Sequence, residues 1–208
     1  MPDAQSRGPG DFLTSKQKLT YVLVLGALTA LGPFTVDLYL PAFPALEASF
    51  RVDAASVQLT LTGTMVGFAV GQLIMGPLSD RYGRRMLLIL ATLVHIAASM
   101  GIALAPSILT LGILRVVQGF GAAAGGVVAM AMVRDLFAGR ALVRMLSRMA
   151  LVNGFAPVIA PVLGSWLLTV TSWRGIFWVL AGYGIVVSLA VTLLIVETLP
   201  KEKRKTQT

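Results

Sequence analysis

The sequence predicts an all-α integral membrane protein with six transmembrane helices. Of its 208 residues, 56% are hydrophobic and only 12% are charged, and the mean hydropathy is +0.83. A soluble domain, in contrast, carries roughly a quarter charged residues. A helix needs about 20 apolar residues to cross the hydrocarbon layer of a bilayer. Six apolar runs reach about that length, at residues 19–40, 57–78, 86–105, 108–133, 149–169 and 176–196.

The positive charges lie almost entirely on one side of these runs. Fourteen of the 17 lysines and arginines precede the first run, separate the second from the third or the fourth from the fifth, or follow the sixth. Only Arg51 and Arg174 lie on the opposite side, and Arg115 lies inside a run. Loops rich in Lys and Arg stay in the cytoplasm, so we expect both termini to be cytoplasmic. The net charge of +8 therefore indicates orientation, and we expect no nucleic-acid partner.

The segments outside the runs predict a division into three parts. Residues 1–15 contain two prolines and two glycines, which favours a flexible cytoplasmic tail. Residues 16–198 form the predicted transmembrane domain, and residues 199–208 form a cytoplasmic linker that opens with a helix-stopping Pro200. The first run is too long for a secretory leader. With no cysteine and one histidine, we expect no catalytic residues, no metal site and no enzyme activity.

The stretch GPLSDRYGRR, residues 76–85, places four charged residues and two glycines between two apolar runs. A glycine at its start allows close helix contact, an aspartate can accept a hydrogen bond or an arginine, and the second glycine permits a tight turn. A generic basic stop signal would account for the arginines but not for this order. The residues that we assign to this loop are Gly76, Asp80, Arg81, Gly83 and Arg84.

Several segments resemble the major facilitator superfamily. The spacing Gly-x-x-x-Asp-Arg-x-Gly-Arg-Arg resembles its cytoplasmic loop signature between helices 2 and 3. LRVVQGFGAAAGG resembles its helix 4 segment Arg-x-x-Gln-Gly-x-Gly, and NGFAPVIAPVLGS resembles the proline-glycine signature of its antiporters, although Ala156, Ala160 and Ser165 stand where glycine is usual. Together with GPFTVDLYLPAFPAL, SWRGIFWVL and ETLP, these segments look like the bicyclomycin and chloramphenicol resistance (Bcr/CflA) branch of drug:proton antiporters.

This resemblance implies a fold and a transport activity. Members of the branch have twelve helices in two six-helix halves with a drug cavity between them, so the chain resembles an N-terminal half, a 3+3 helix bundle. The resemblance implies export of small drug-like molecules, such as chloramphenicol- or bicyclomycin-type antibiotics, across the bacterial inner membrane. Export would be driven by the proton gradient and need no cofactor. The implied partners are the drug, protons, membrane lipid, and a C-terminal half or second copy. The alternatives are a proton-coupled uptake carrier of the same fold and a truncated chain that does not transport.

Two charged residues lie within the apolar runs. We expect Asp37 to be the acid that couples transport to protons and Arg115 to be its electrostatic partner in the substrate cavity, and the resemblance adds Gln118. Asp37 would instead be an interfacial acid near the end of the first run, unless Pro41 and Pro44 only bend a longer helix. The alternative for Arg115 is a long side chain that snorkels to the headgroups.

The resemblance also suggests moving parts. Pro157 and Pro161, together with Gly164, would form a hinge in the fifth run, because each proline removes a helical hydrogen bond. The loop at residues 76–85 would form a latch against the second half. The glycines of the fourth run predict a packing face.

Two further features carry predictions from the residues alone. His95 lies in the third run without a second histidine or an acid, which favours a hydrogen bond between helices over a proton relay. Arg140, Arg144 and Arg148 recur every four residues, which predicts one basic stripe that contacts anionic lipid headgroups.

Overall fold

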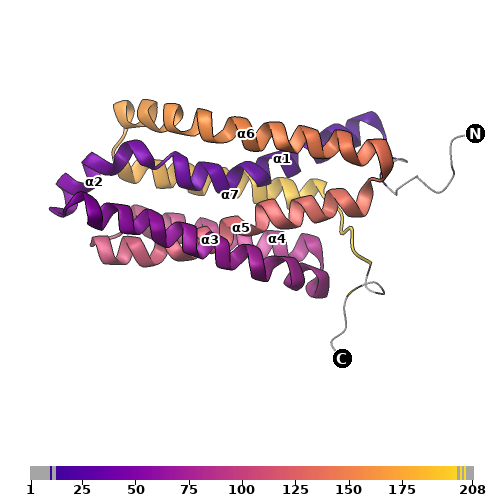
Figure 1. The fold of residues 1–208 in the computed structure, drawn as a ribbon, viewed down its shortest axis with the longest axis horizontal. Coiled ribbons are helices and arrows are strands. Elements are labelled where there is room, and N and C mark those ends of the chain that lie inside the picture. The colour runs from indigo at the N-terminus through magenta and orange to yellow at the C-terminus, as the bar shows by residue number, and fades with distance from the viewer. Residues whose placement is uncertain (1–9, 11–12, 201, 203, 205–208) are drawn as a thin grey trace, which may run out of the picture.

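The computed structural model describes Gly10, residues 13–200, Glu202 and Arg204, and it is a bundle of long helices (Figure 1). The elements are α1 (Ser15–Asp37), the short 3₁₀ helix η3 (Leu40–Ala42), α2 (Phe43–Phe50), α3 (Ala54–Tyr82), α4 (Arg84–Ala103), α5 (Ile108–Leu136), α6 (Gly139–Val170) and α7 (Trp173–Leu194). Within the described part, six helical stretches are long and apolar enough to cross a membrane. The predicted all-α fold with six transmembrane helices is confirmed.

The long helices run side by side, and α1 begins at the same end of the bundle at which α7 ends (Figure 1). We call this the terminal end, and the opposite end the far end. The side of the membrane on which the terminal end lies stays a prediction. The predicted tail and linker fall mostly outside the described residues.

Short polar side chains start several of the helices. The Gln17 backbone N–H donates to Thr14 Oγ1 (3.2 Å), and the Thr14 N–H donates to Gln17 Oε1 (2.9 Å), which forms a capping box for α1. At the start of α3, Asp53 Oδ1 accepts from the Ser56 N–H (2.9 Å). Hydrogen bonds from the Ser56 side chain and backbone lower the pKa of Asp53 below its usual value. Ser107 caps α5 in the same way. These caps satisfy N–H groups that the helices cannot bond internally.

The first membrane-spanning stretch is longer than the apolar run at residues 19–40. It extends over Ser15–Phe50 and includes α1, η3 and α2. Pro41 lies inside η3 and Pro44 lies in the first turn of α2, where a missing backbone N–H costs little. The two prolines therefore bend this stretch without ending it. Asp37 consequently lies within the stretch and not at its end.

Helix α5 is at the centre of the bundle and packs closely against its neighbours. A Cβ built on Gly119 would lie 2.1 Å from the Thr64 carbonyl oxygen of α3, and one built on Gly125 would lie 2.2 Å from the Leu28 carbonyl oxygen of α1. No side chain fits at such distances, so these glycines bring helix backbones into contact. The predicted packing face is confirmed at Gly119, Gly121 and Gly125, but not at Gly126, where a Cβ would meet open space. Helices α3 and α6 are the least buried spans.

The interior of the bundle has two apolar clusters with polar residues between them. The cluster toward the terminal end includes Leu25 and Met132, and the cluster toward the far end includes Leu46 and Phe177. The residues between the clusters are all buried and come from α1, α4 and α5. We call them the polar layer: Thr35, His95, Ser99, Arg115 and Gln118.

Candidate functional site

Arg115 is completely enclosed in the polar layer, with 0% of its surface exposed. Its Nη1 donates to the Thr35 carbonyl oxygen (2.8 Å) and to Gln118 Oε1 (2.8 Å). Its guanidinium carbon lies 4.2 Å from the centroid of the Tyr39 ring and 5.7 Å from that of Phe177. The negative faces of these rings stabilise the cation. Arg115 therefore points into the bundle and does not snorkel to the headgroups.

The other members of the polar layer continue the chain of hydrogen bonds. Gln118 Nε2 donates to Ser99 Oγ (2.8 Å), and Ser99 Oγ donates to the His95 carbonyl oxygen (2.7 Å). The Thr35 hydroxyl donates to the Leu31 carbonyl oxygen (2.6 Å) and lies 2.9 Å from His95 Nε2. The hydroxyl has one proton, so while it donates to Leu31 it accepts from the Nε2-protonated tautomer of His95. The predicted hydrogen bond between helices at His95 is confirmed, and the layer ties α1, α4 and α5 together.

Three nitrogen atoms of the polar layer have no hydrogen-bond partner among the described residues. They are Nε and Nη2 of Arg115 and Nδ1 of His95. With Nε2 protonated, His95 Nδ1 is an acceptor, whereas both Arg115 atoms are donors. The layer thus retains unused hydrogen-bonding capacity in its interior.

Asp37 lies at a second site, a hollow of about 460 Å³ between α1, α3, α5 and α6 that we call the Asp37 hollow. The Asp37 side chain is half-buried. The hollow combines hydrogen-bonding groups with apolar surface. Its lining includes Asp37, Met65, Phe68, Gln72, Gly126 and Asn153.

The structure brings Gln118 to Arg115 but keeps Asp37 apart from both. Among the described residues, neither a hydrogen bond nor an ion pair joins Asp37 to Arg115. The reason is helical geometry. Thr35 and Asp37 are two residues apart, which is about 200° around a helix of 3.6 residues per turn. Thr35 faces the polar layer and Asp37 faces away from it, so the contact that Arg115 makes with α1 is two residues away from Asp37.

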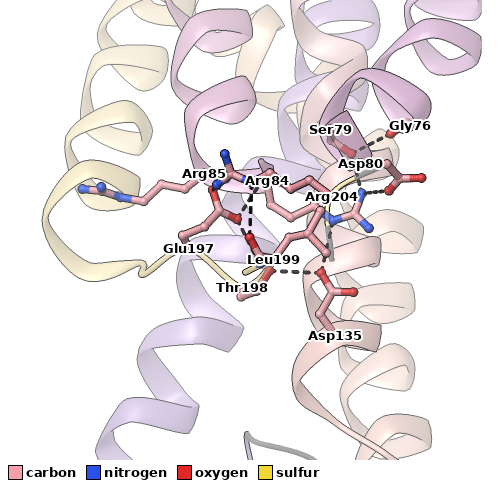
Figure 2. A network of polar contacts seen from close by, with 10 residues as sticks. All are labelled: Gly76, Ser79, Asp80, Arg84, Arg85, Asp135, Glu197, Thr198, Leu199 and Arg204. Atoms are coloured by element: carbon pink, nitrogen blue, oxygen red, sulfur yellow. Dashed lines mark hydrogen bonds and ion pairs between the residues drawn. The ribbon is translucent and has the colours of Figure 1, made fainter. Parts of the chain in front are cut away.

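The predicted loop forms a network of polar contacts at the terminal end (Figure 2). Arg84 is only 8% exposed. It pairs with Asp80 (Nη1 to Oδ1, 2.6 Å) and with Asp135 (Nε to Oδ2, 3.1 Å), and its Nη1 also donates to Ser79 Oγ. Asp135 accepts a further hydrogen bond from the Thr198 hydroxyl (3.1 Å). The network joins the end of α3, the start of α4, the end of α5 and the segment after α7.

Glu197 is the second centre of this network. Its carboxylate accepts from the backbone N–H groups of Arg84 (2.9 Å) and Arg85 (3.2 Å) and lies 3.7 Å from Arg204 Nη2. A carboxylate at the N-terminus of a helix is favourable because the helix dipole is positive there. Gly83 has φ +102°, and a Cβ on it would lie 2.5 Å from Glu197 Oε2. Only glycine fits at position 83.

Among the described contacts, Arg81 lies outside this network, and Gly76 enters it only through its carbonyl oxygen, which accepts a hydrogen bond from Ser79 Oγ (2.7 Å; Figure 2). A Cβ on Gly76 would lie 3.6 Å from the Val127 side chain, an ordinary contact, so the close helix approach predicted at Gly76 is not seen. Arg81 lies over the Tyr82 ring, 5.2 Å from its centroid.

The sequence reasoning did not assign a role to Asp135 or Glu197. Glu197 opens the ETLP segment, residues 197–200, which contributes to the resemblance to the antiporter branch. The sequence therefore marks Glu197 as notable but does not indicate its contacts.

The predicted hinge residues lie in α6, which is one helix from Gly139 to Val170 with Pro157 and Pro161 inside it. A Cβ on Gly164 would lie 2.3 Å from the Leu38 carbonyl oxygen. Gly164 therefore lets α6 contact the end of α1. Motion about the prolines stays a prediction.

Comparison with known proteins agrees with this architecture. The Major Facilitator Superfamily domain matches residues 25–208. The chain is 36% identical over 189 residues to a bicyclomycin resistance protein homolog of Haemophilus influenzae, covering 91% of this chain and 48% of that protein. It is 38% identical over 161 residues to a chloramphenicol resistance protein of Pseudomonas aeruginosa, covering 75% of this chain and 38% of that protein.

A solved structure also shares the fold. The structure of a D-xylose-proton symporter superposes with a TM-score of 0.73 at 15% identity, covering 85% of this chain and 48% of that one. The chain thus spans about half the length, or less, of the proteins that it matches. Six apolar helices, the loop network and the matched domain together identify a multi-pass integral membrane protein, which in bacteria resides in the inner membrane. The chain belongs to the major facilitator superfamily and corresponds to an N-terminal half of its drug-resistance relatives.

Proposed function

We propose that this chain is the N-terminal half of a proton-coupled antiporter that exports small, mostly apolar drug-like molecules. Its relatives include proteins named for bicyclomycin and chloramphenicol resistance, which supports a drug as the substrate. Transporters of this architecture work by rocking two halves around a site near the middle of the membrane. The second half would supply the other wall of that site.

The observation that carries this proposal is the half-buried carboxylate of Asp37 in a hollow of about 460 Å³. Apolar side chains such as Met65 and Phe68 offer contact to a hydrophobic drug, and Gln72 and Asn153 offer hydrogen bonds. A dry hollow favours the protonated form of this carboxylate, whereas water, or a hydrogen bond from a polar group of the drug to the ionised oxygens, favours the form that has released its proton. Drug and proton would therefore compete for the same hollow.

The polar layer would hold α1 in place while this exchange occurs. Arg115 is bonded to the Thr35 carbonyl (2.8 Å), which is two residues from Asp37 on the same helix. A shift of α1 on proton binding would change this contact and the cation–π contact with Tyr39. Arg115 would thus act as a positioning residue, and the proposed electrostatic partnership with Asp37 would act through α1.

The loop network would serve as a latch at the terminal end. Asp80 and Arg84, with Asp135, hold three helix ends together by ion pairs. In a twelve-helix protein the same charged surface would meet the second half and separate from it when the cavity opens to the cytoplasm.

Proton release on drug addition tests the proposed function directly. The assay uses a purified twelve-helix protein that contains this chain as its first half, in weakly buffered detergent solution over a series of pH values. The parent should release protons when drug binds, and Asp37→Asn should bind drug without releasing them. Asp37→Asn should also abolish drug transport driven by a pH gradient. Unchanged proton release in Asp37→Asn would rule out Asp37 as the coupling acid.

A further inference from the structure

A basic hollow of about 370 Å³ lies at the terminal end, between the starts of α1 and α6. Three cationic side chains from two helices line it: Lys18 from α1, and Arg144 and Arg148 from α6. The sequence had placed Arg140, Arg144 and Arg148 in one stripe. All three arginines lie four residues apart in α6, and Arg144 and Arg148 line the hollow together with Lys18, whereas Arg140 does not.

The electrostatics of the basic hollow favour an anion. Within the described part of the chain, Arg144 and Arg148 make no hydrogen bond or ion pair, so their charges are not balanced by these residues. Helix α6 begins beside the hollow at Gly139 and has no side-chain cap. Its N-terminus therefore adds a partial positive charge. Two arginines beside one cavity repel each other unless a negative group lies between them.

Apart from Ser15, the remaining walls of the basic hollow are apolar. Leu19, Phe137 and Met145 line it beside the three cations. Leu19 is 56% exposed, and Leu23, one turn further along α1, is 63% exposed. Exposed apolar surface therefore continues from the hollow along α1 into the span. A small hydrophilic anion gains no stabilisation from this apolar surface, whereas the acyl chain of a lipid is stabilised by contact with it.

We propose that the basic hollow binds the phosphate group of an anionic phospholipid, with the acyl chains lying along α1. The hollow is at the level where the first span leaves the apolar layer, which is the level of the headgroups. The terminal end is expected to be cytoplasmic, and the cytoplasmic leaflet carries the anionic lipids that attract clustered Lys and Arg. The basic hollow shares no lining residue with the Asp37 hollow, although Leu19 and Asp37, about five turns apart, lie on one face of α1. The proposed lipid site does not depend on the proposed transport function.

Competitive lipid binding tests the site in the 208-residue chain itself. The chain is purified in detergent with equimolar phosphatidylglycerol and phosphatidylcholine, and native mass spectrometry measures the ratio of the two bound lipids. The parent should prefer phosphatidylglycerol. The double variant Arg144→Gln/Arg148→Gln should lose most of this preference, by roughly fivefold for each charge removed.

Three controls separate the basic hollow from general surface charge and from free phosphate. Arg140→Gln removes a charge from the same stripe but not from the hollow, so the preference should remain. Arg144→Lys/Arg148→Lys retains the charges and should keep most of the preference, which guards against a folding defect. Inorganic phosphate, compared with chloride at matched ionic strength, should not displace phosphatidylglycerol. Equal binding of the two lipids by the parent, an equal loss in Arg140→Gln, or displacement by inorganic phosphate would each overturn the assignment.

Discussion

Arg115 and Asp37 are both charged residues within the membrane spans, yet the structure places them in different surroundings. Arg115 is fully enclosed, with a carbonyl oxygen, an amide oxygen and two aromatic rings around its guanidinium. Asp37 is half-buried at the wall of a hollow. The two sites touch the same helix, α1, on opposite faces. One face of α1 contacts the enclosed Arg115 of α5, and the opposite face presents Asp37 to the hollow. The two charges therefore have different chemical surroundings.

An enclosed cation with fixed partners differs chemically from a carboxylate at an open wall. Arginine keeps its proton in proteins, so Arg115 can hold a geometry but cannot carry protons. Asp37 can exchange its proton with water or substrate in the hollow. The polar layer is thus suited to structure, and the Asp37 hollow is suited to exchange.

Replacement of Arg115 should have the largest effect, because it removes the centre of the polar layer. Arg115→Ala leaves the Thr35 carbonyl and the Gln118 amide without this donor, and a buried unsatisfied polar group costs about 1–3 kcal/mol. We expect a loss of about 3 kcal/mol in the free energy of unfolding, which corresponds to roughly 6–12 °C in unfolding temperature for a chain of this size. Thermal unfolding in detergent measures it.

Two variants serve as controls for this stability prediction. Arg115→Lys keeps a cation beside the Tyr39 ring and should lose less than Arg115→Ala. Asp37→Asn keeps the shape of a side chain that faces the hollow, so its unfolding temperature should stay close to that of the parent. If Asp37→Asn destabilised the protein as much as Arg115→Ala, the contrast between the two sites would fail.

Cysteine reactivity should distinguish the two faces of α1. The chain has no cysteine, so single variants Thr35→Cys and Asp37→Cys can be compared without background. A small, water-soluble thiol reagent should modify Asp37→Cys at least about tenfold faster, because thiol reactivity requires access. Equal rates would show that the polar layer and the hollow are equally open. Prior denaturation should make both variants fully reactive, which confirms that each thiol is intact.

The sequence was sufficient to predict the spans but not the faces that they present. Long apolar runs and the glycines of the fourth run follow from composition and local pattern, and the spans and three of these glycine contacts are confirmed. The separation of Asp37 from Arg115 could not be read from the sequence, because the first span is apolar on most sides and is bent by Pro41 and Pro44. The contacts of Asp135 and Glu197 with Arg84 join residues 51 and 113 positions apart. Such long-range pairs leave no local pattern.

The loop network provides a third set of charges, less enclosed than Arg115 and more constrained than Asp37. Glu197→Gln removes the negative charge from the N-terminus of α4 and should cost about 1 kcal/mol, or roughly 2–4 °C in unfolding temperature. Asp80→Asn leaves Arg84 paired with Asp135, so its cost should be below about 1 kcal/mol. These shifts are measured by thermal unfolding.

Transport assays add a second measurement for the loop network. In a twelve-helix protein that contains this chain, Asp80→Asn should insert normally, because acidic residues contribute little to orientation, and yet transport less drug. If Asp80→Asn transported drug as well as the parent does, the latch hypothesis would fail, and the loop would serve only to orient the chain in the membrane.

The smallest effect is expected at Gln72, an exposed residue of α3 that lines the Asp37 hollow. If the hollow binds drug through hydrogen bonds as well as apolar contact, Gln72→Leu removes one hydrogen bond of about 1 kcal/mol, which is roughly a fivefold loss of affinity. Gln58→Leu is the matched control, because Gln58 is exposed on the same helix but does not line the hollow. Equilibrium drug binding to the twelve-helix protein should weaken only in Gln72→Leu, with no change in unfolding temperature for either variant. An equal loss in Gln58→Leu would mean that the affinity depends on the polarity of α3 in general and not on the hollow.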